Sequence, residues 1–286
     1  MPSNNIRCLH KGPRGFMWIG TSAGLVRYDG NQKKVYTTND GLPSNKIWAI
    51  CDGPEGNLWV GTYGGGTVYY DGDTFHTPSR DSIKGPKNIR TLYHHEESQR
   101  IFAGGEKGFA SMNTDTVYDH FKKRDNGERD RYQIAGFYSF GQDSILVLPI
   151  YGKAIIYNIK DKGYEALQKN SPFDMLSFSS LEKGDSMIIG GNGLRIVENE
   201  KILLDFQAFR KKWKKKKGAI WDITANGQGD LWVAIWGGNR GENGALFRVD
   251  SSGYHPMSRT YGIDSETFWS CEYDRENELL FVGTLG

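Results

Sequence analysis

The sequence predicts an all-β protein, a seven-bladed β-propeller whose last blade is truncated after its second strand. Three observations support this prediction. Glycine is frequent (37 of 286 residues), proline is rare (9) and aromatic residues make up 13% of the chain, which is typical of many short strands joined by tight turns. A short segment that contains tryptophan and glycine recurs along the chain. Each copy lies in a unit with room for four strands.

The recurring segment is the strongest of these observations. Residues 16–21 (FMWIGT) reappear as residues 57–62 (NLWVGT) and 279–284 (LLFVGT), and residues 231–234 (LWVA) are a copy in which alanine replaces glycine. Periods of about 40 to 50 residues are typical of propeller blades, so the series predicts seven units. The glycine position falls at residues 20, 61, 104, 148, 190, 234 and 283, at spacings of 41 to 49 residues.

Each unit has the same order of expected strands. In the second unit, an alternating segment (residues 47–51) is followed by a polar turn (52–57), the Trp-containing strand and a third strand that ends in aspartate (68–71). A short fourth strand closes the unit, as residues 34–37 do in the first one. One blade cannot bury its own faces, so the units are expected to stack as a single domain over residues 1–286. The expected repeats are about 1–46, 47–87, 88–131, 132–174, 175–217, 218–266 and, in part, 267–286.

Three motifs resemble a known repeat family. Residues 56–62 (GNLWVGT), 28–30 (YDG) and 41–45 (GLPSN) are similar to the two-component regulator propeller repeat, closely in units one, two, six and seven and only in period and pattern in units three to five. That repeat builds the sensor region of hybrid two-component systems, common in gut Bacteroides and their relatives. The resemblance implies a periplasmic location, and a transmembrane helix with kinase and DNA-binding modules elsewhere in the parent receptor.

Charge and composition exclude several classes of protein. The net charge of +2 does not favour a nucleic-acid-binding protein, although seven positive charges gather in residues 210–217. We interpret this basic run as a solvated loop, with an attractor for acidic ligands or a polyanion contact as alternatives. No segment approaches the ~20 apolar residues of a membrane span. Three cysteines imply no disulfide framework.

One end of the expected ring gathers candidate ligand-binding residues. The first strand of each blade is expected to line the channel, so the turn that enters it and the turn between strands two and three share one face. Aromatic rings pack on the apolar faces of sugars, and amide and guanidinium groups bind hydroxyl or carboxylate groups. For any single one of these residues, packing between blades is the favoured interpretation, and Trp18, Trp59 and Trp232 are predicted to be core. The candidate ligand-binding residues are Arg7, Trp48, Tyr63, Arg90, Tyr151, Trp221, Trp236, Asn239, Arg240 and Trp269.

The sequence predicts no catalytic residue, no metal site and no cofactor. Residues 20–24 (GTSAG) match the G-x-S-x-G pattern of hydrolases, but that motif needs a strand-to-helix elbow, and a hairpin turn is expected here. Residues 52–57 lack the alternating ligands and closing glutamate of a calcium loop. The histidines are expected at the far end of the first strand or on outer strands, away from the candidate face.

We therefore interpret the chain as the ligand-sensing, extracytoplasmic propeller of a two-component signalling receptor and not as an enzyme. The predicted partner is an oligosaccharide or glycan fragment on the channel face. A second copy of the chain, in a homodimer formed through the parent receptor, is a further predicted partner. This domain is not expected to bind nucleic acid, and no membrane segment is expected in it. Two alternatives remain open: a scaffold propeller that binds another protein or dimerises without a small ligand, and a propeller lyase or hydrolase. An exposed apolar belt would favour the first, and a pocket carboxylate or histidine with perturbed titration the second.

Overall fold

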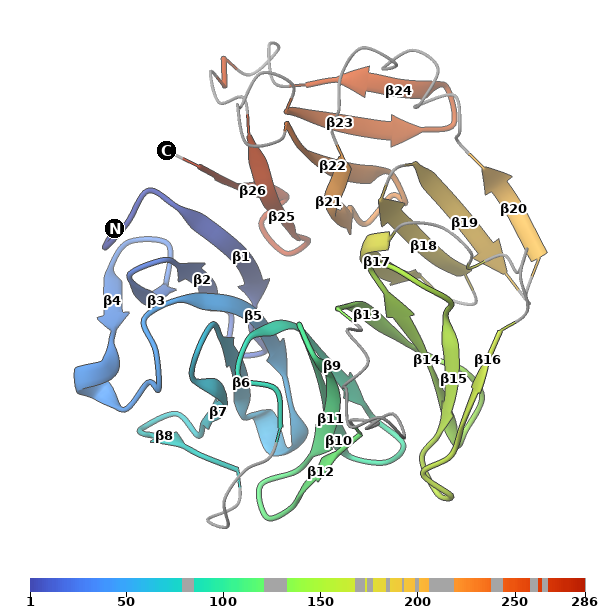
Figure 1. Ribbon diagram of the computed structural model, residues 1–286. Coiled ribbons are helices and arrows are strands. Elements are labelled where there is room, and N and C mark those ends of the chain that lie inside the picture. Colours follow the sequence, from blue (N-terminus) through green and yellow to red (C-terminus); the bar gives the residue numbers. More distant parts are fainter. Residues whose placement is uncertain are drawn as a thin grey trace.

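The computed structural model describes residues 1–78, 85–120, 133–167, 173, 177–183, 186–191, 193–198, 201–205, 219–237, 244–257, 262–263 and 267–285. Within these residues the regular structure is almost entirely β-strand, and the strands form antiparallel sheets around one axis (Figure 1). The strands of each four-stranded sheet, called a blade here, are paired in the order in which they follow along the chain. Two short 3-10 helices, η1 (Thr38–Asp40) and η2 (Pro54–Gly56), lie in connections of the first two blades.

The strands have the following bounds. Blades 1 and 2 contain β1 (Ile6–Lys11), β2 (Met17–Thr21), β3 (Gly24–Tyr28), β4 (Lys33–Tyr36), β5 (Ile47–Asp52), β6 (Leu58–Thr62), β7 (Gly66–Tyr70) and β8 (Phe75–His76). Blades 3 and 4 contain β9 (Ile89–His95), β10 (Arg100–Gly105), β11 (Gly108–Met112), β12 (Val117–Asp119), β13 (Ile134–Ser139), β14 (Ser144–Pro149), β15 (Ile155–Asn158) and β16 (Tyr164–Ala166). Blades 5 and 6 contain β17 (Ser177–Lys183), β18 (Ser186–Gly191), β19 (Leu194–Glu198), β20 (Lys201–Asp205), β21 (Ala219–Ala225), β22 (Leu231–Trp236), β23 (Ala245–Asp250) and β24 (Gly253–Pro256). The last sheet contains β25 (Phe268–Asp274) and β26 (Leu279–Thr284).

The all-β propeller is confirmed, but the predicted count of seven blades is corrected. The described residues form six complete, four-stranded blades, and the last sheet consists of β25 and β26 alone. The first strands of the sheets contact one another around the axis, and β25 lies between β21 and β1 (Figure 1). The predicted count came from the recurring Trp–Gly segment. That segment marks a second strand, so counting its copies does not count complete blades.

The recurring glycine is required because adjacent blades approach closely at this point. The first strand of each sheet, which lies nearest the axis, is called its inner strand here. A Cβ atom on Gly61 would clash with Ile89, the first residue of the inner strand of the next blade, and one on Gly20 would lie 2.9 Å from Cγ2 of Ile47. In these two contacts an isoleucine at the start of the next inner strand therefore occupies the space that a side chain on the preceding blade would need. The same relation joins Gly104 to Ile134, Gly190 to Ile220 and, between the last sheet and blade 1, Gly283 to Ile6.

The tryptophans at the repeated mid-strand position belong to the core, as predicted. Trp59 is fully buried, and Trp18 and Trp232 are also buried. Trp18 packs against Tyr36 and Tyr70, with ring centroids 6.0 and 5.7 Å apart. These rings fill the layer between neighbouring sheets and hold each blade on the next.

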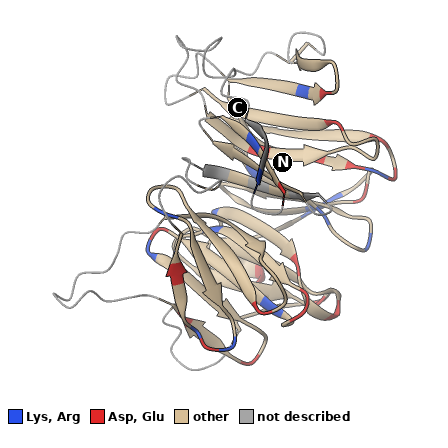
Figure 2. Ribbon diagram, turned by 90° about the vertical axis from the view of Figure 1, so that its right-hand side faces the viewer, with Lys and Arg blue, Asp and Glu red and all other residues tan. Residues whose placement is uncertain are grey.

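Charged residues lie mainly at the ends of strands and in turns. Figure 2 shows Lys and Arg interspersed with Asp and Glu along the part of the chain drawn in colour. The basic run at residues 210–217 lies outside the described residues. All three cysteines are free thiols. Among the residues that the structure describes, no helix has the length and apolar character needed to cross a membrane.

Candidate functional site

A β-bulge near the start of each inner strand places one extra residue at the mouth of the channel. In β1, Ile6 pairs with Thr21 and Cys8 pairs with Gly20, so Arg7 is an extra residue between two consecutive partners. The same one-residue shift occurs in β5, β9, β13, β17, β21 and β25. A bulge interrupts the alternation of a strand and re-aims the side chain that it carries. The bulged residues with described side chains are Arg7, Trp48, Arg90, Ala135, Trp221 and Trp269.

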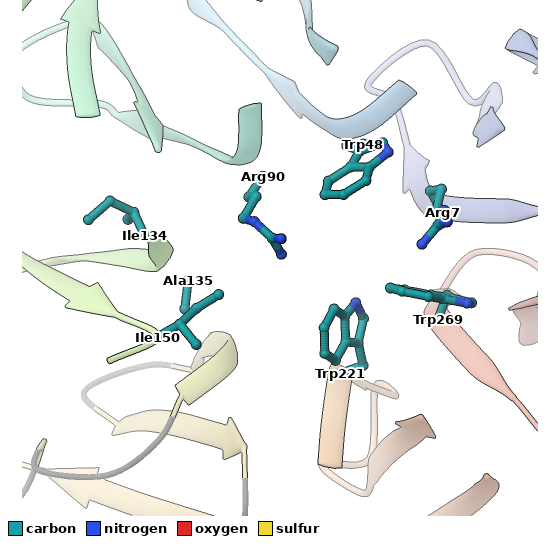
Figure 3. A pocket seen from close by; sticks show the side chains of 8 residues that line it. All are labelled: Arg7, Trp48, Arg90, Ile134, Ala135, Ile150, Trp221 and Trp269. Carbon is teal, nitrogen blue, oxygen red and sulfur yellow. The ribbon is translucent and has the colours of Figure 1, made fainter. Parts of the chain in front are cut away.

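All six of these side chains line one pocket, together with Ile134 and Ile150. Figure 3 shows the arginines and tryptophans around an opening, with Ile134, Ala135 and Ile150 grouped on one side of it. The cavity has a volume of about 60 Å³, which is room for a few water molecules. Because a sugar ring is larger than this, a saccharide would lie across the mouth and place only a substituent inside.

Three tryptophans from blade 6 and the last sheet form an aromatic cluster beside the pocket. The ring centroid of Trp221 lies 4.8 Å from that of Trp269, at an interplanar angle of 85°, and 5.2 Å from that of Trp236. Trp236 and Trp269 are 5.9 Å apart. On blade 2, Trp48 lies 4.7 Å from Tyr63. The three rings of the cluster are only partly buried, so part of their apolar surface stays open to a ligand.

Arg7 and Arg90 bring two positive charges to the same pocket. The guanidinium carbon of Arg7 lies 4.0 Å from the ring centroid of Trp269 and 5.3 Å from that of Trp48, and Arg90 lies 5.1 Å from Trp48. Arg90 forms an ion pair of 3.4 Å with Glu106, whereas Arg7 forms none with the described residues. Burial, and the neighbouring Arg90 charge, hold the pKa of Arg7 below its usual value. Arginine nevertheless stays protonated in proteins, so the pocket keeps its positive charge.

The pocket also has more hydrogen-bond donors than acceptors. The Nε atoms of Arg7 and Arg90 and the Nε1 atom of Trp269 are buried, and none of them has an acceptor within the described part of the chain. A buried donor without an acceptor costs about 1–3 kcal/mol. A ligand that supplies acceptors at this position would recover that cost.

The structure brings together five of the predicted site residues in this pocket: Arg7, Trp48, Arg90, Trp221 and Trp269. Tyr63 and Trp236 support it from outside through their ring contacts. Tyr151 is 64% exposed and does not line the pocket. Asn239 and Arg240 lie outside the described residues. Ligand binding by any of these residues stays a prediction.

Sequence reasoning missed the apolar wall formed by Ile134, Ala135 and Ile150. A usable signal was present for Ala135. In six of the seven sheets the bulged residue directly follows an Ile or Phe at or near the start of the inner strand, as Ala135 follows Ile134 and Trp48 follows Ile47. Ile150 comes from the turn after β14 and has no comparable signal.

The opposite end of the channel contains charged groups that pair with one another. Nζ of Lys11 donates to Oδ2 of Asp274 at 2.6 Å, and Nε2 of His10 lies 2.8 Å from Oδ1 of Asp52. Burial would raise the pKa of Asp274, but hydrogen bonds from Lys11 and Asn277 hold it at about 2. A larger cavity of about 350 Å³ lies at this end. Glu272 also lines this cavity; its carboxyl accepts a hydrogen bond of 3.4 Å from the backbone N–H of Lys11, and burial raises its pKa.

No catalytic arrangement accompanies the GTSAG segment. Ser22 lies in the turn between β2 and β3, and its hydroxyl shares a hydrogen bond of 2.8 Å with that of Ser3. A serine nucleophile needs a base within hydrogen-bond reach, and no such contact is made by Ser22 with the described residues. Over the same residues, no group of three or more His, Cys, Asp or Glu side chains has the geometry to hold a metal ion.

Comparison with known proteins supports the family resemblance. Residues 1–23 and 41–64 match the family model of the two-component regulator propeller. The extracellular domain of BT4673 from B. thetaiotaomicron, described as a hybrid two-component system, has a TM-score of 0.72 and 20% identity over 99% of this chain, which spans 37% of that domain. PorZ, a surface component of the type-IX secretion system of Porphyromonas gingivalis, has a TM-score of 0.64 and 11% identity over 99% of this chain and 36% of its own. At these identities the likeness shows the fold alone. A comparison with curated protein sequences returned no match.

Proposed function

From the premise that this chain carries two-component regulator propeller repeats, we propose that it is a sensory propeller whose channel mouth recognises an oligosaccharide for a signalling receptor. The observation that carries the proposal is the convergence of bulged residues from separate sheets on one pocket. Four tryptophan rings and two guanidinium groups meet there or beside it, although they are far apart in the sequence. Rings with exposed faces suit sugars, and guanidinium groups suit their polar substituents.

The proposed location is extracytoplasmic, and periplasmic in a bacterium with two membranes. The support is indirect: the similar domain of BT4673 is described as extracellular. Absence of catalysis is part of the proposal, because the matched repeat is a regulator module and that domain belongs to a signalling system. The kinase, the membrane anchor and a homodimer through the parent receptor belong to the proposal as well, since this chain spans little more than a third of the similar domain.

The first prediction tests whether the aromatic cluster holds the ligand. A thermal-shift screen over neutral and acidic oligosaccharides identifies a binder, because a ligand that binds the folded state raises the melting temperature. Replacing Trp236 by alanine is then expected to weaken its binding by about 1–3 kcal/mol, the usual cost of losing an aromatic anchor. Titration calorimetry measures the change.

Tyr164→Ala is the matched control, because Tyr164 is an exposed aromatic residue on an outer strand. This control is expected to leave affinity unchanged. Full affinity in a folded Trp236→Ala variant would place the ligand elsewhere and contradict the proposal. A screen in which no saccharide raises the melting temperature would contradict it as well.

A further inference from the structure

The mouth pocket has an excess of positive charge and of hydrogen-bond donors, and this excess points to one class of ligand. Two guanidinium groups reach the pocket and only one carboxylate, Glu106, pairs with them among the described residues. We propose that Arg7 and Arg90 form a binding site for a single oxyanion group, a carboxylate or a sulfate carried by the saccharide. This inference rests on the proposed recognition function and names the chemical class of its ligand.

The ring contacts of the arginines leave N–H donors for such a group, although one donor of Arg90 is shared with Glu106. Arg7 lies against the rings of Trp269 and Trp48, and Arg90 lies against Trp48. Ring contacts engage the face of a guanidinium group, while its N–H groups point outward in its plane. Oxyanions bind guanidinium groups through that edge, often with two parallel hydrogen bonds. The stacked rings therefore hold both groups in place without using the atoms that an oxyanion needs.

The unsatisfied donors favour an acceptor that has no protons to donate. Nε of Arg7, Nε of Arg90 and Nε1 of Trp269 are all buried without an acceptor in the described residues. A neutral hydroxyl could accept a bond from them, but it also brings a proton that needs an acceptor of its own. A carboxylate or sulfate brings acceptors alone and a charge as well. The partly buried setting strengthens that charge interaction relative to open water.

The dimensions of the pocket agree with a single group rather than a whole ring. Its volume of about 60 Å³ holds a few waters or one oxyanion. Ile134, Ala135 and Ile150 close one side with apolar surface, so the charged group is confined to the side of the arginines (Figure 3). The sugar that carries it would extend over the cluster of Trp221, Trp236 and Trp269.

The second prediction uses a matched pair of probes, glucuronate and glucose, which share the pyranose ring and differ in the carboxylate. Calorimetry is expected to show that glucuronate binds at least about tenfold more tightly than glucose, since a charge-assisted bond is roughly twice as strong as a neutral one. Arg7→Met and Arg90→Met are expected to remove the preference, because glucuronate then loses more affinity than glucose does. Arg14→Met, which removes an exposed arginine beyond the far end of β1, is the charge-matched control and is expected to retain it.

A gain-of-function variant keeps the test decisive if an arginine variant does not fold. Glu106→Gln removes the carboxylate that pairs with Arg90, so the preference for glucuronate is expected to increase. Inorganic sulfate is the third probe. Competition between sulfate and glucuronate for the protein supports the oxyanion site. If sulfate binds with the same affinity as glucuronate, free anions and not sugars are the ligands of this site. Equal affinity for glucuronate and glucose, a preference that survives in Arg7→Met, or no binding of any probe overturns the inference. If a saccharide from the screen still loses affinity in Trp236→Ala, the sensory proposal stands without it.

Discussion

Replacing Gly61 by alanine is expected to lower the free energy of unfolding by about 1–3 kcal/mol, and replacing it by valine by more. The added Cβ atom would clash with Ile89 at the contact between blades 2 and 3 and would lie 3.3 Å from Cβ of Ala49. Both neighbours are buried parts of β-strands and cannot move aside cheaply. Chemical denaturation of the parent and the variants, followed by tryptophan fluorescence, measures the loss.

Gly163→Ala is the control for the general cost of a glycine substitution. Gly163 is exposed and has no atom within 4 Å of the position that a Cβ would take, so the free energy of unfolding of this variant is expected to change little. The pair Gly61→Ala and Ile89→Ala extends the test, because a smaller residue 89 makes room for the new methyl group. The double variant is expected to lose less stability than the sum of the single losses. Additive losses would mean that the glycine is not needed for the contact between the blades.

As the pH rises from about 5 to about 8, the loss of a proton from the Asp222 carboxyl is expected to lower the free energy of unfolding by about 2 kcal/mol. Burial raises the pKa of its carboxyl to about 7, although two backbone N–H groups, of Cys271 and Ile223, donate to it. The nearby Glu272 raises this pKa further. Between the ordinary value of 3.8 and about 7 the folded protein holds a proton that the unfolded chain releases. Stability is therefore highest at low pH and is lost as the pH passes through the folded-state pKa.

Asp222→Asn removes this titration while keeping the size of the side chain. The variant loses one acceptor at every pH, so the informative quantity is the change in its stability relative to the parent between the two pH values. That difference is expected to move in favour of the variant by about 2 kcal/mol as the pH rises. The exposed Asp115→Asn serves as the control and is expected to show no such change. A pH-independent difference for Asp222→Asn would mean that its carboxyl titrates normally.

Much of the fold could be predicted because propeller contacts repeat. The glycine at position 61 and the isoleucine at position 89 belong to two neighbouring units, and the same pair recurs at 20 and 47. A contact that is made between every pair of neighbours appears in the sequence as a period, and the tryptophans at positions 18, 59 and 232 have the same origin. The count of seven blades did not hold among the described residues, because the seventh copy of the recurring segment lies in a sheet of two strands, β25 and β26.

The candidate site was predicted in part. Arg7, Trp48 and Trp269 were predicted because the turns that enter the first strands were expected at the channel mouth, and because aromatic rings and guanidinium groups suit a sugar. Ala135 carries no chemistry of its own, so only its position directly after Ile134 could have marked it as a wall of the pocket. Tyr151 was assigned to the same face, yet its side chain turns to solvent. Residue type therefore indicated which side chains could bind, whereas local backbone geometry determined which of them reach the pocket.

By itself, the sequence determined the class of fold, the core tryptophans and the glycine positions, because these depend on contacts between adjacent units that repeat along the chain. The tertiary structure decided which of the candidate side chains line the pocket. A bulge arises from the pairing of two strands, and its single extra residue at the start of β1, β5, β9, β13, β21 and β25 re-aims side chains that simple alternation would place elsewhere. Ring closure then brings Arg7 of β1 over Trp269 of β25, at opposite ends of the chain, with their centres 4.0 Å apart. Both the bulges and the ring closure depend on how strands pair and pack in the folded chain, and no local sequence pattern specifies those contacts.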